Sequence, residues 1–266
     1  MNEQSAIRFD HVTLLLPVGK GKKRARILAE MAMKEGQWNN KWVGGLISSR
    51  RNMLTVTALN DISLTIERGD KVGLIGHNGA GKSTILRVMA GIYYPSSGAC
   101  EVRGKVSTLF TPTLGLDVNS TGLENIELAG ITLGLSRSAI KSLIPQIVEF
   151  CELGHYLQMP MRTYSAGMRT RLGFAIATSI EPDILLIDEV FGAGDRRFQN
   201  KARLRLDAML GKANTLVLAS HADDIVRSFC NKAIWMEHGH IRAMGAVDEV
   251  LAQFNALSDQ DSAQSL

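Results

Sequence analysis

Apolar side chains recur at strand spacing near both ends of the chain and at helical spacing between them. Alternating apolar positions within Ile7–Leu16 and Ile62–Ile66 predict two strands, the first of edge type. Residues 17–54 lack this pattern and are predicted to be irregular, apart from a short helix that Arg26–Lys34 could form. Further strands are predicted at Lys71–Ile75, Ile184–Ile187, Thr215–Ala219 and, as a closing hairpin, Ala233–Glu237 with Ile241–Ala243.

Helical spacing begins at Ser83–Ile92, a predicted helix that the turn residues Tyr94–Gly98 end. Residues from about 116 to 180 are predicted to be mainly helical. This segment contains Thr121-Gly122-Leu123-Glu124, which has the form of a capping box, then Ser138–Leu153 interrupted at Pro145, then Ser165–Ile180. Phe198–Leu210 carries one apolar helix face, whereas Ser258–Leu266 is polar and is predicted to be disordered.

The composition is that of an ordinary soluble α/β protein, with 266 residues, 45% of them hydrophobic and 21% charged. No apolar run approaches the roughly 18 residues that span a bilayer, and Met1–Ser5 lacks the hydrophobic core of a signal peptide. We therefore expect a cytoplasmic protein that reaches a membrane through a partner chain. Cys100, Cys151 and Cys230 form no Cys-x-x-Cys pair, which argues against a zinc or redox motif. The mild net charge of +4 gives weak support for nucleic acid binding, and no nucleic acid partner is expected.

A glycine-rich loop between a predicted strand and a predicted helix is the first candidate site. Gly76-His77-Asn78-Gly79-Ala80-Gly81-Lys82-Ser83 has the G-x-x-x-x-G-K-S spacing, in which glycines let the backbone wrap phosphate groups. Backbone N–H groups and the helix N-terminus then face the negative charge. Lys82 should reach the β- and γ-phosphates, and the Ser83 hydroxyl should bind Mg²⁺. The predicted nucleotide-binding residues are Gly76, Asn78, Gly79, Gly81, Lys82, Ser83 and Thr84, with ATP and Mg²⁺ as cofactors.

An acidic pair follows the apolar run Ile184–Ile187. At such a position Asp188 and Glu189 either begin the next helix or serve a nucleotide site. Downstream of a phosphate loop we favour the second interpretation. Asp188 would then hold Mg²⁺ from outside its direct ligands, and Glu189 would polarise the attacking water as general base.

Two further stretches extend the pattern, which runs from about residue 56 to about residue 245. Tyr164-Ser165-Ala166-Gly167-Met168 opens a helix, and His221 closes the apolar strand Thr215–Ser220. Alone, these would be a serine helix cap and a surface histidine. Together with the phosphate loop and the acidic pair, they resemble the nucleotide-binding subunit of an ABC transporter.

The resemblance implies roles for these residues. Ser165 and Gly167 match the family element that closes on the γ-phosphate from the opposite protomer, while Ala166 and Met168 depart from its common form. His221 matches the switch histidine that contacts the γ-phosphate and links hydrolysis to dimer closure. The implied catalytic residues are Lys82, Glu189 and His221, and the implied metal-binding residues are Ser83 and Asp188. Asp195, in Gly192–Asp195, matches the acid of the dimer-contact loop.

Three stretches indicate one branch of this family. Tyr164–Phe174, Asp188-Glu189-Val190 with the following Gly194, Asp195 and Phe198, and Thr121–Ile126 are similar to the ATPase subunits of bacterial polysaccharide exporters. Those subunits serve the export of capsule, O-antigen or teichoic acid. Some carry a C-terminal carbohydrate-binding domain, which we do not expect in a sequence of this length.

Two positions depart from the family pattern. Val56 and Thr57 stand where an aromatic residue usually stacks on adenine, and Thr111 stands where a Gln or an acid usually contacts Mg²⁺. Base recognition is therefore expected to be loose, unless residues 17–54 supply the missing ring.

Residues 17–54 form a basic insertion with several cationic side chains and two tryptophans, Trp38 and Trp42. Members of the resembling group can carry an extra helix here, at the cytoplasmic entrance of the channel. Cations at that place could attract a pyrophosphate-linked lipid or anionic headgroups, at about 1 kcal/mol each. The alternative is a solvated loop with no specific partner. The basic residues are Lys20, Lys22, Lys23, Arg24, Arg26, Lys34, Lys41, Arg50 and Arg51.

The sequence therefore predicts an α/β P-loop ABC-type ATPase with a RecA-like core, an antiparallel β subdomain and an inserted helical subdomain over residues 116–180. Residues 1–257 form the ATP-binding domain. The expected assembly is a homodimer with two copies of a membrane permease, peripheral at the cytoplasmic face of the inner membrane. It would export a lipid-linked polysaccharide, which it contacts indirectly or through the basic insertion. The alternatives are the same ATPase with a drug or lipid cargo, and a regulator that binds ATP without hydrolysing it.

Overall fold

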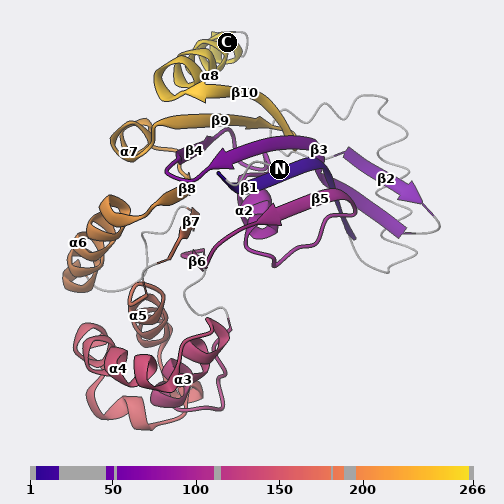
Figure 1. The fold of residues 1–266 in the computed structure, drawn as a ribbon. Helices are drawn as coiled ribbons and strands as arrows, with labels where there is room; N and C mark the ends of the chain where they lie inside the picture. Colours follow the sequence, from indigo (N-terminus) through magenta and orange to yellow (C-terminus); the bar gives the residue numbers. More distant parts are fainter. Residues whose placement is uncertain are drawn as a thin grey trace. The chain divides into compact units, whose positions relative to one another are not determined.

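The computed structural model describes residues 4–17, 46–50, 53–110, 115–180, 182–188 and 196–263. The chain divides into two compact units (Figure 1). Unit 1 comprises Met1–Arg103 with Thr215–Leu266, and unit 2 comprises Gly104–Asn214.

An antiparallel sheet forms the first layer of unit 1. Its strands are β1 (Ser5–Pro17), β2 (Leu46–Arg50), β3 (Met53–Glu67) and β5 (Ser97–Val102), in the order β2-β3-β1-β5. The predicted strands Ile7–Leu16 and Ile62–Ile66 lie within β1 and β3. The structure corrects the prediction that residues 17–54 are irregular throughout, because Leu46–Arg50 pairs with the first half of β3. That pairing gives backbone hydrogen bonds to a segment whose own sequence has no strand periodicity.

A second sheet of unit 1 carries the phosphate loop. The strand β4 (Lys71–Ile75) has the parallel neighbours β8 (Thr215–Ala219) and β9 (Lys232–Glu237), and β10 (His240–Ala246) is antiparallel to β9. The bounds predicted for β4 and β8 are confirmed. After their first residues, Lys71 and Thr215, both strands are unbroken runs of apolar residues and glycine, as expected for parallel strands covered on both faces.

Among its described residues, unit 1 has the helices α2 (Lys82–Met89), α7 (Asp223–Phe229) and α8 (Val247–Ala263). The helix predicted at Ser83–Ile92 is therefore confirmed, although it ends earlier than predicted. The predicted disorder from Ser258 is wrong for residues 258–263, because they continue α8. Val250 and Leu251, in the first half of α8, are buried in an apolar cluster. Their burial stabilises the helix, and the polar sequence from Ser258 onward gives no sign of it.

Unit 2 contains a short parallel strand pair and a group of helices. The strands are β6 (Val106–Thr108) and β7 (Ile184–Asp188). The helices are α3 (Gly122–Thr132), α4 (Arg137–Cys151), α5 (Ala166–Ala177) and α6 (Arg196–Lys212), with short 3₁₀ turns at Gly154–Gln158 and Met161–Thr163. They share a core of apolar side chains around Phe150, Leu172, Phe174 and Phe198.

The predicted interruption of α4 at Pro145 is wrong, because the helix continues to Cys151. A proline inside a helix costs about 3 kcal/mol. Burial of Ile147 and Phe150 beyond the proline offsets that cost, since both side chains are at least 94% removed from solvent. Within the described ranges, no helix has the length and apolar character that crossing a membrane would require.

Candidate functional site: a phosphate loop and a helix N-terminus

The phosphate loop of unit 1 joins β4 to α2, which confirms the strand–loop–helix context predicted for it. Gly76 has a φ of 141° and Gly81 a φ of 108°, values that residues other than glycine rarely adopt. A Cβ atom on Gly76 would also overlap the backbone carbonyl of Met236 on β9. The glycines at these two positions are thus required by the backbone path of the loop.

Lys82 is held inside the loop rather than in solvent. Its side chain is 7% exposed, and Nζ donates to the carbonyl oxygens of Gly76 at 2.5 Å and His77 at 3.1 Å. The N-cap of α2 is Gly81, which has no side chain to cap the helix. A helix N-terminus of this kind, next to a buried ammonium group, suits the phosphates of a nucleotide. Ser83 and Thr84 follow in the first turn of α2, where they are half-buried.

His221 lies at the same edge of the sheet as the phosphate loop. The strands β8 and β4 are parallel neighbours, with Ala219 opposite Leu74. The N–H of Ser220 donates to the carbonyl of Leu74 at 3.4 Å. Because the carboxyl ends of parallel strands meet at one edge, unit 1 brings the exposed His221 and the loop after Ile75 to neighbouring positions.

In unit 2, Ser165 is the N-cap of α5, and its hydroxyl accepts a hydrogen bond from Met168 N at 3.2 Å. The serine therefore caps the helix, which was the simpler interpretation of this stretch. Ser165 and Gly167 also line a cavity of about 570 Å³. The other lining residues are Glu152, Leu153, Tyr156, Met168 and Arg171.

The start of α3 supports the residue before Ser165. The predicted capping box is confirmed, with Thr121 accepting from Glu124 N and Glu124 accepting from Thr121 N. A Cβ atom on Gly122 would lie 2.5 Å from the hydroxyl oxygen of Tyr164. That hydroxyl donates to the carbonyl of Tyr156 at 2.6 Å. The glycine after Thr121 thus leaves room for the tyrosine that precedes the cap of α5.

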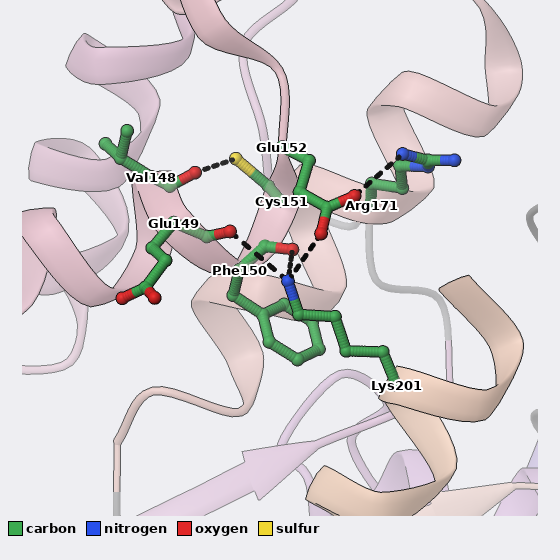
Figure 2. Close-up of polar contacts among 7 residues, drawn as sticks. All are labelled: Val148, Glu149, Phe150, Cys151, Glu152, Arg171 and Lys201. Carbon is green, nitrogen blue, oxygen red and sulfur yellow. Dashed lines mark hydrogen bonds and ion pairs between the residues drawn. The ribbon is translucent and has the colours of Figure 1, made fainter. Parts of the chain in front are cut away.

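Figure 2 shows an ionic cluster at the end of α4 in unit 2. Lys201 of α6 pairs with Glu152 at 2.8 Å, and Arg171 of α5 lies 4.0 Å from the other oxygen of the same carboxylate. The hydrogen bond from Lys201 lowers the pKa of the Glu152 carboxyl below its ordinary value. The cluster connects α4, α5 and α6. Sequence inspection missed it, because no local pattern marks an ion pair between distant residues.

The roles of several predicted site residues rest on the sequence. Glu189, Gly192–Asp195, Thr111 and most of the basic insertion, including both of its tryptophans, lie outside the described residues. Their roles stay predictions. Asp188 is described and ends β7, half-buried. Val56 and Thr57 lie on β3 between β1 and β2.

Three comparisons with known proteins extend these observations. The family model described as "ABC transporter" matches residues 59–192. The chain is 51% identical over 199 residues to the O-antigen export system ATP-binding protein RfbE of Yersinia enterocolitica, covering 74% of this chain and 83% of that protein. It is 40% identical over 209 residues to the teichoic acids export ATP-binding protein TagH of Bacillus cereus, covering 79% of this chain but 38% of that longer protein. A dimeric post-hydrolysis structure of the ATP-binding cassette MJ0796 with ADP and Pi has a TM-score of 0.62 at 20% identity, and covers 91% of this chain and 98% of that chain.

The fold and the phosphate loop define a P-loop ATPase. The chain belongs to the ABC transporter family, as its motifs indicated, and the predicted fold class is confirmed. The relatives also bear out the predicted branch of the family, because RfbE is named as an ATP-binding protein of O-antigen export and TagH as one of teichoic acids export.

Proposed function

We propose that this chain binds and hydrolyses ATP to drive export of a lipid-linked polysaccharide across the inner membrane, through a separate membrane subunit. The observation that supports this cargo is the 51% identity to RfbE, an O-antigen export system ATP-binding protein, over 83% of that protein's length. The chain would act at the cytoplasmic face of the membrane, as a peripheral subunit.

The phosphate loop would bind the triphosphate through backbone N–H groups around Gly76, Asn78, Gly79 and Gly81. The ammonium group of Lys82 already lies within the loop. We propose that it exchanges its hydrogen bonds to the loop carbonyls for contacts with the β- and γ-phosphates. The loss of those two neutral acceptors would be offset by stronger charge-assisted hydrogen bonds to phosphate oxygens.

The remaining catalytic roles follow from residue chemistry. Mg²⁺, when bound, would neutralise charge on the β- and γ-phosphates, with Ser83 as its ligand and Asp188 holding it indirectly. Glu189 would take the proton of the attacking water, since its carboxylate is the general base expected after β7. His221 would contact the γ-phosphate from the sheet edge that it shares with the loop.

The active assembly in this proposal is a head-to-tail homodimer. Ser165 and Gly167 of one protomer would close on the γ-phosphate bound by the other protomer. The dimeric form of the MJ0796 cassette, which shares this fold, supports the proposal. Two membrane subunits would receive the movement through the helical region near residues 110–140.

The ATPase proposal is tested with Glu189→Gln. We expect this variant to bind ATP, to dimerise with ATP, and to hydrolyse it at least about a hundredfold more slowly, because a general base contributes that much or more. Light scattering measures the dimer, and phosphate release measures turnover. Glu127→Gln is the matched control, since Glu127 is exposed on α3. Wild-type turnover in Glu189→Gln would remove Glu189 as the base.

The cargo is tested by affinity purification of Glu189→Gln from its native host in detergent with ATP, followed by mass spectrometry of proteins and lipids. The proposal expects a multi-span membrane subunit together with a lipid-linked glycan. A membrane subunit carrying a different lipid or a drug would assign another cargo to the same ATPase. A soluble dimer alone would favour a regulator that binds ATP.

A further inference from the structure

The C-terminal helix α8 contacts the phosphate loop directly. The ring of His77, the second residue of the loop, lies 5.3 Å from the ring of Phe254, with an angle of 48° between them. Phe254 also meets Trp235 edge to face, at 5.7 Å and 72°. Trp235 is 6% exposed and lies opposite Ile75, the residue that precedes the loop. A single side chain of α8 thus touches the loop and the strand beside it.

The helix that carries Phe254 is anchored on several sides. Val250 and Leu251 are buried in one apolar cluster with Ile75 and Trp235. Arg227 of α7 forms an ion pair with Asp248 near the start of α8. Further along α8, Asn255 Nδ2 donates to Asp223 Oδ2 at 2.9 Å, at the start of α7 just after His221. These contacts hold α8, and therefore Phe254, in a fixed position next to the loop.

His77 is also held through its backbone carbonyl, which accepts a hydrogen bond from Lys82. The carbonyl oxygens of Gly76 and His77 both accept from Lys82 Nζ. His77, Asn78 and Gly79 are exposed, and the carbonyl of His77 also accepts from Ala80 N at 3.2 Å within the loop. A ring contact from outside reduces the conformations that the loop must give up when a ligand binds.

We propose that Phe254 is a positioning residue for the phosphate loop. It holds the ring of His77 and thereby orients the carbonyl groups that hold Lys82, so that the loop is preorganised for the phosphates of a nucleotide. This inference rests on the proposed nucleotide binding. It gives α8 a role in the affinity for nucleotide, in addition to its part in the core of unit 1.

The test measures the dissociation constant of Mg-ADP, which is not hydrolysed, by calorimetry on the full chain. Phe254→Leu keeps apolar volume but removes the ring, and should weaken binding about 2- to 30-fold, the range typical of changes along a packed network. Phe254→Tyr keeps the ring and should restore wild-type affinity. Val250→Ala, in the same apolar cluster, should lower the melting temperature while leaving the affinity unchanged. Should Phe254→Leu fail to fold, Phe254→Met takes its place with the same expectation.

A spectroscopic readout separates positioning from stability. The chain has three tryptophans, so Trp38→Phe with Trp42→Phe leaves Trp235 as the only indole emitter. Mg-ADP should change the emission of Trp235, and Phe254→Leu should remove most of that change at saturating Mg-ADP. The inference would be overturned if Phe254→Leu kept the full Mg-ADP-induced change in Trp235 emission. It would also be overturned if Val250→Ala lost as much affinity for Mg-ADP as Phe254→Leu.

Lys82→Ala distinguishes the two proposals. Wild-type affinity for Mg-ADP in Lys82→Ala would argue against the proposed nucleotide site itself. Loss of binding in Lys82→Ala, together with wild-type affinity in Phe254→Leu, would remove only the positioning role of Phe254.

Discussion

The ammonium group of Lys201 lies 2.8 Å from Oε1 of Glu152 and also donates to the carbonyl oxygens of Glu149 and Phe150. These acceptors are at the C-terminal end of α4, where backbone carbonyls have no partner within the helix. The same ammonium group lies 4.9 Å from the centroid of the Phe150 ring. Lys201 thus joins α6 to the end of α4, and Arg171 links α5 to the same carboxylate (Figure 2).

Lys201→Met should therefore destabilise unit 2. A cation at a helix C-terminus contributes about 0.3–1 kcal/mol, and we expect a loss of this size in the free energy of unfolding at about pH 7. Urea unfolding followed by circular dichroism measures it. Lys141→Met is the control, because Lys141 is exposed on the first half of α4. Equal stability of the two variants would contradict this role for Lys201.

The same pair predicts a pH dependence. Lys201 lowers the pKa of Glu152 below its ordinary value of 4.5, so the charged carboxylate is favoured in the folded chain. This contribution is fully present above pH 4.5 and is lost as the pH falls through the lowered pKa. The difference in stability between wild type and Lys201→Met should therefore shrink in acid. A difference that stays constant down to about pH 2 would contradict it.

Gly76 and Gly69 allow the cost of crowding in the phosphate loop to be separated from the cost of φ. Both have positive φ, 141° and 94°, but a Cβ atom would overlap Met236 at Gly76 and meet nothing within 4 Å at Gly69. Gly69→Ala should cost about 1–2 kcal/mol. Gly76→Ala should cost about 3 kcal/mol or more and abolish ATP binding. Thermal unfolding measures the stability of each variant, and calorimetry measures its ATP binding. If Gly69→Ala and Gly76→Ala lost similar stability, the overlap of the Gly76 Cβ with Met236 would be excluded as the cause.

The sequence predicted best those elements whose burial is continuous. Lys71–Ile75 and Thr215–Ala219 are central strands, so their apolar runs mark their ends correctly. The strand β2 was missed because Leu46–Arg50 depends on pairing with β3, and its own sequence lacks the alternation of a strand. Glycine spacing located the phosphate loop, since the backbone itself requires those residues. The contact between His77 and Phe254 could not be predicted, because tertiary packing joins a loop and a helix that are far apart in the sequence.

Asn125 organises the turn before α3. It is fully buried, its Oδ1 accepts from Asp117 N at 2.7 Å, and its Nδ2 donates to the carbonyls of Asp117, Ser120 and Thr121. Asn125→Ala would remove the amide's hydrogen bonds to the N–H and carbonyl of Asp117, whereas Ser120 O and Thr121 O would keep Met161 N and the backbone N–H of residue 125 as donors. We expect a cost of about 1–3 kcal/mol. Urea unfolding measures the loss. Asn119→Ala, at an exposed position of the same turn, should be neutral, and a neutral Asn125→Ala would contradict the role of its amide.

The three cysteine thiols should react slowly in the folded chain. Burial raises the pKa of Cys230 to about 12 and that of Cys100 to about 11, and it also raises the pKa of Cys151. Because the thiolate is the reactive form, alkylation by iodoacetamide at about pH 8 should be at least about a hundredfold slower than in guanidinium chloride. Mass spectrometry of the alkylated peptides assigns a rate to each cysteine. Native rates close to the denatured ones would show that these thiols are accessible.

His11 and Asp61 form a strained pair in unit 1. Both have left-handed backbone, with φ of 51° and 53°, and His11 Nδ1 lies 2.7 Å from Asp61 Oδ1. The hydrogen bond to Asp61, followed by the negative charge of that carboxylate, raises the pKa of His11 above its ordinary value of 6.5. The pair therefore stabilises the folded chain fully below pH 6.5, and that contribution is lost as the pH rises through the raised pKa.

His11→Asn tests this titration without changing the backbone requirement, because asparagine tolerates left-handed conformations. Wild type should melt at a higher temperature than His11→Asn at about pH 6, and the difference should decrease by about pH 9, where His11 is neutral. Asp61→Asn should remove the same pH dependence, since it removes the charge that favours the protonated ring. A difference that is equal at both pH values would mean that packing around His11, and not its protonation, supports the pairing of β1 with β3.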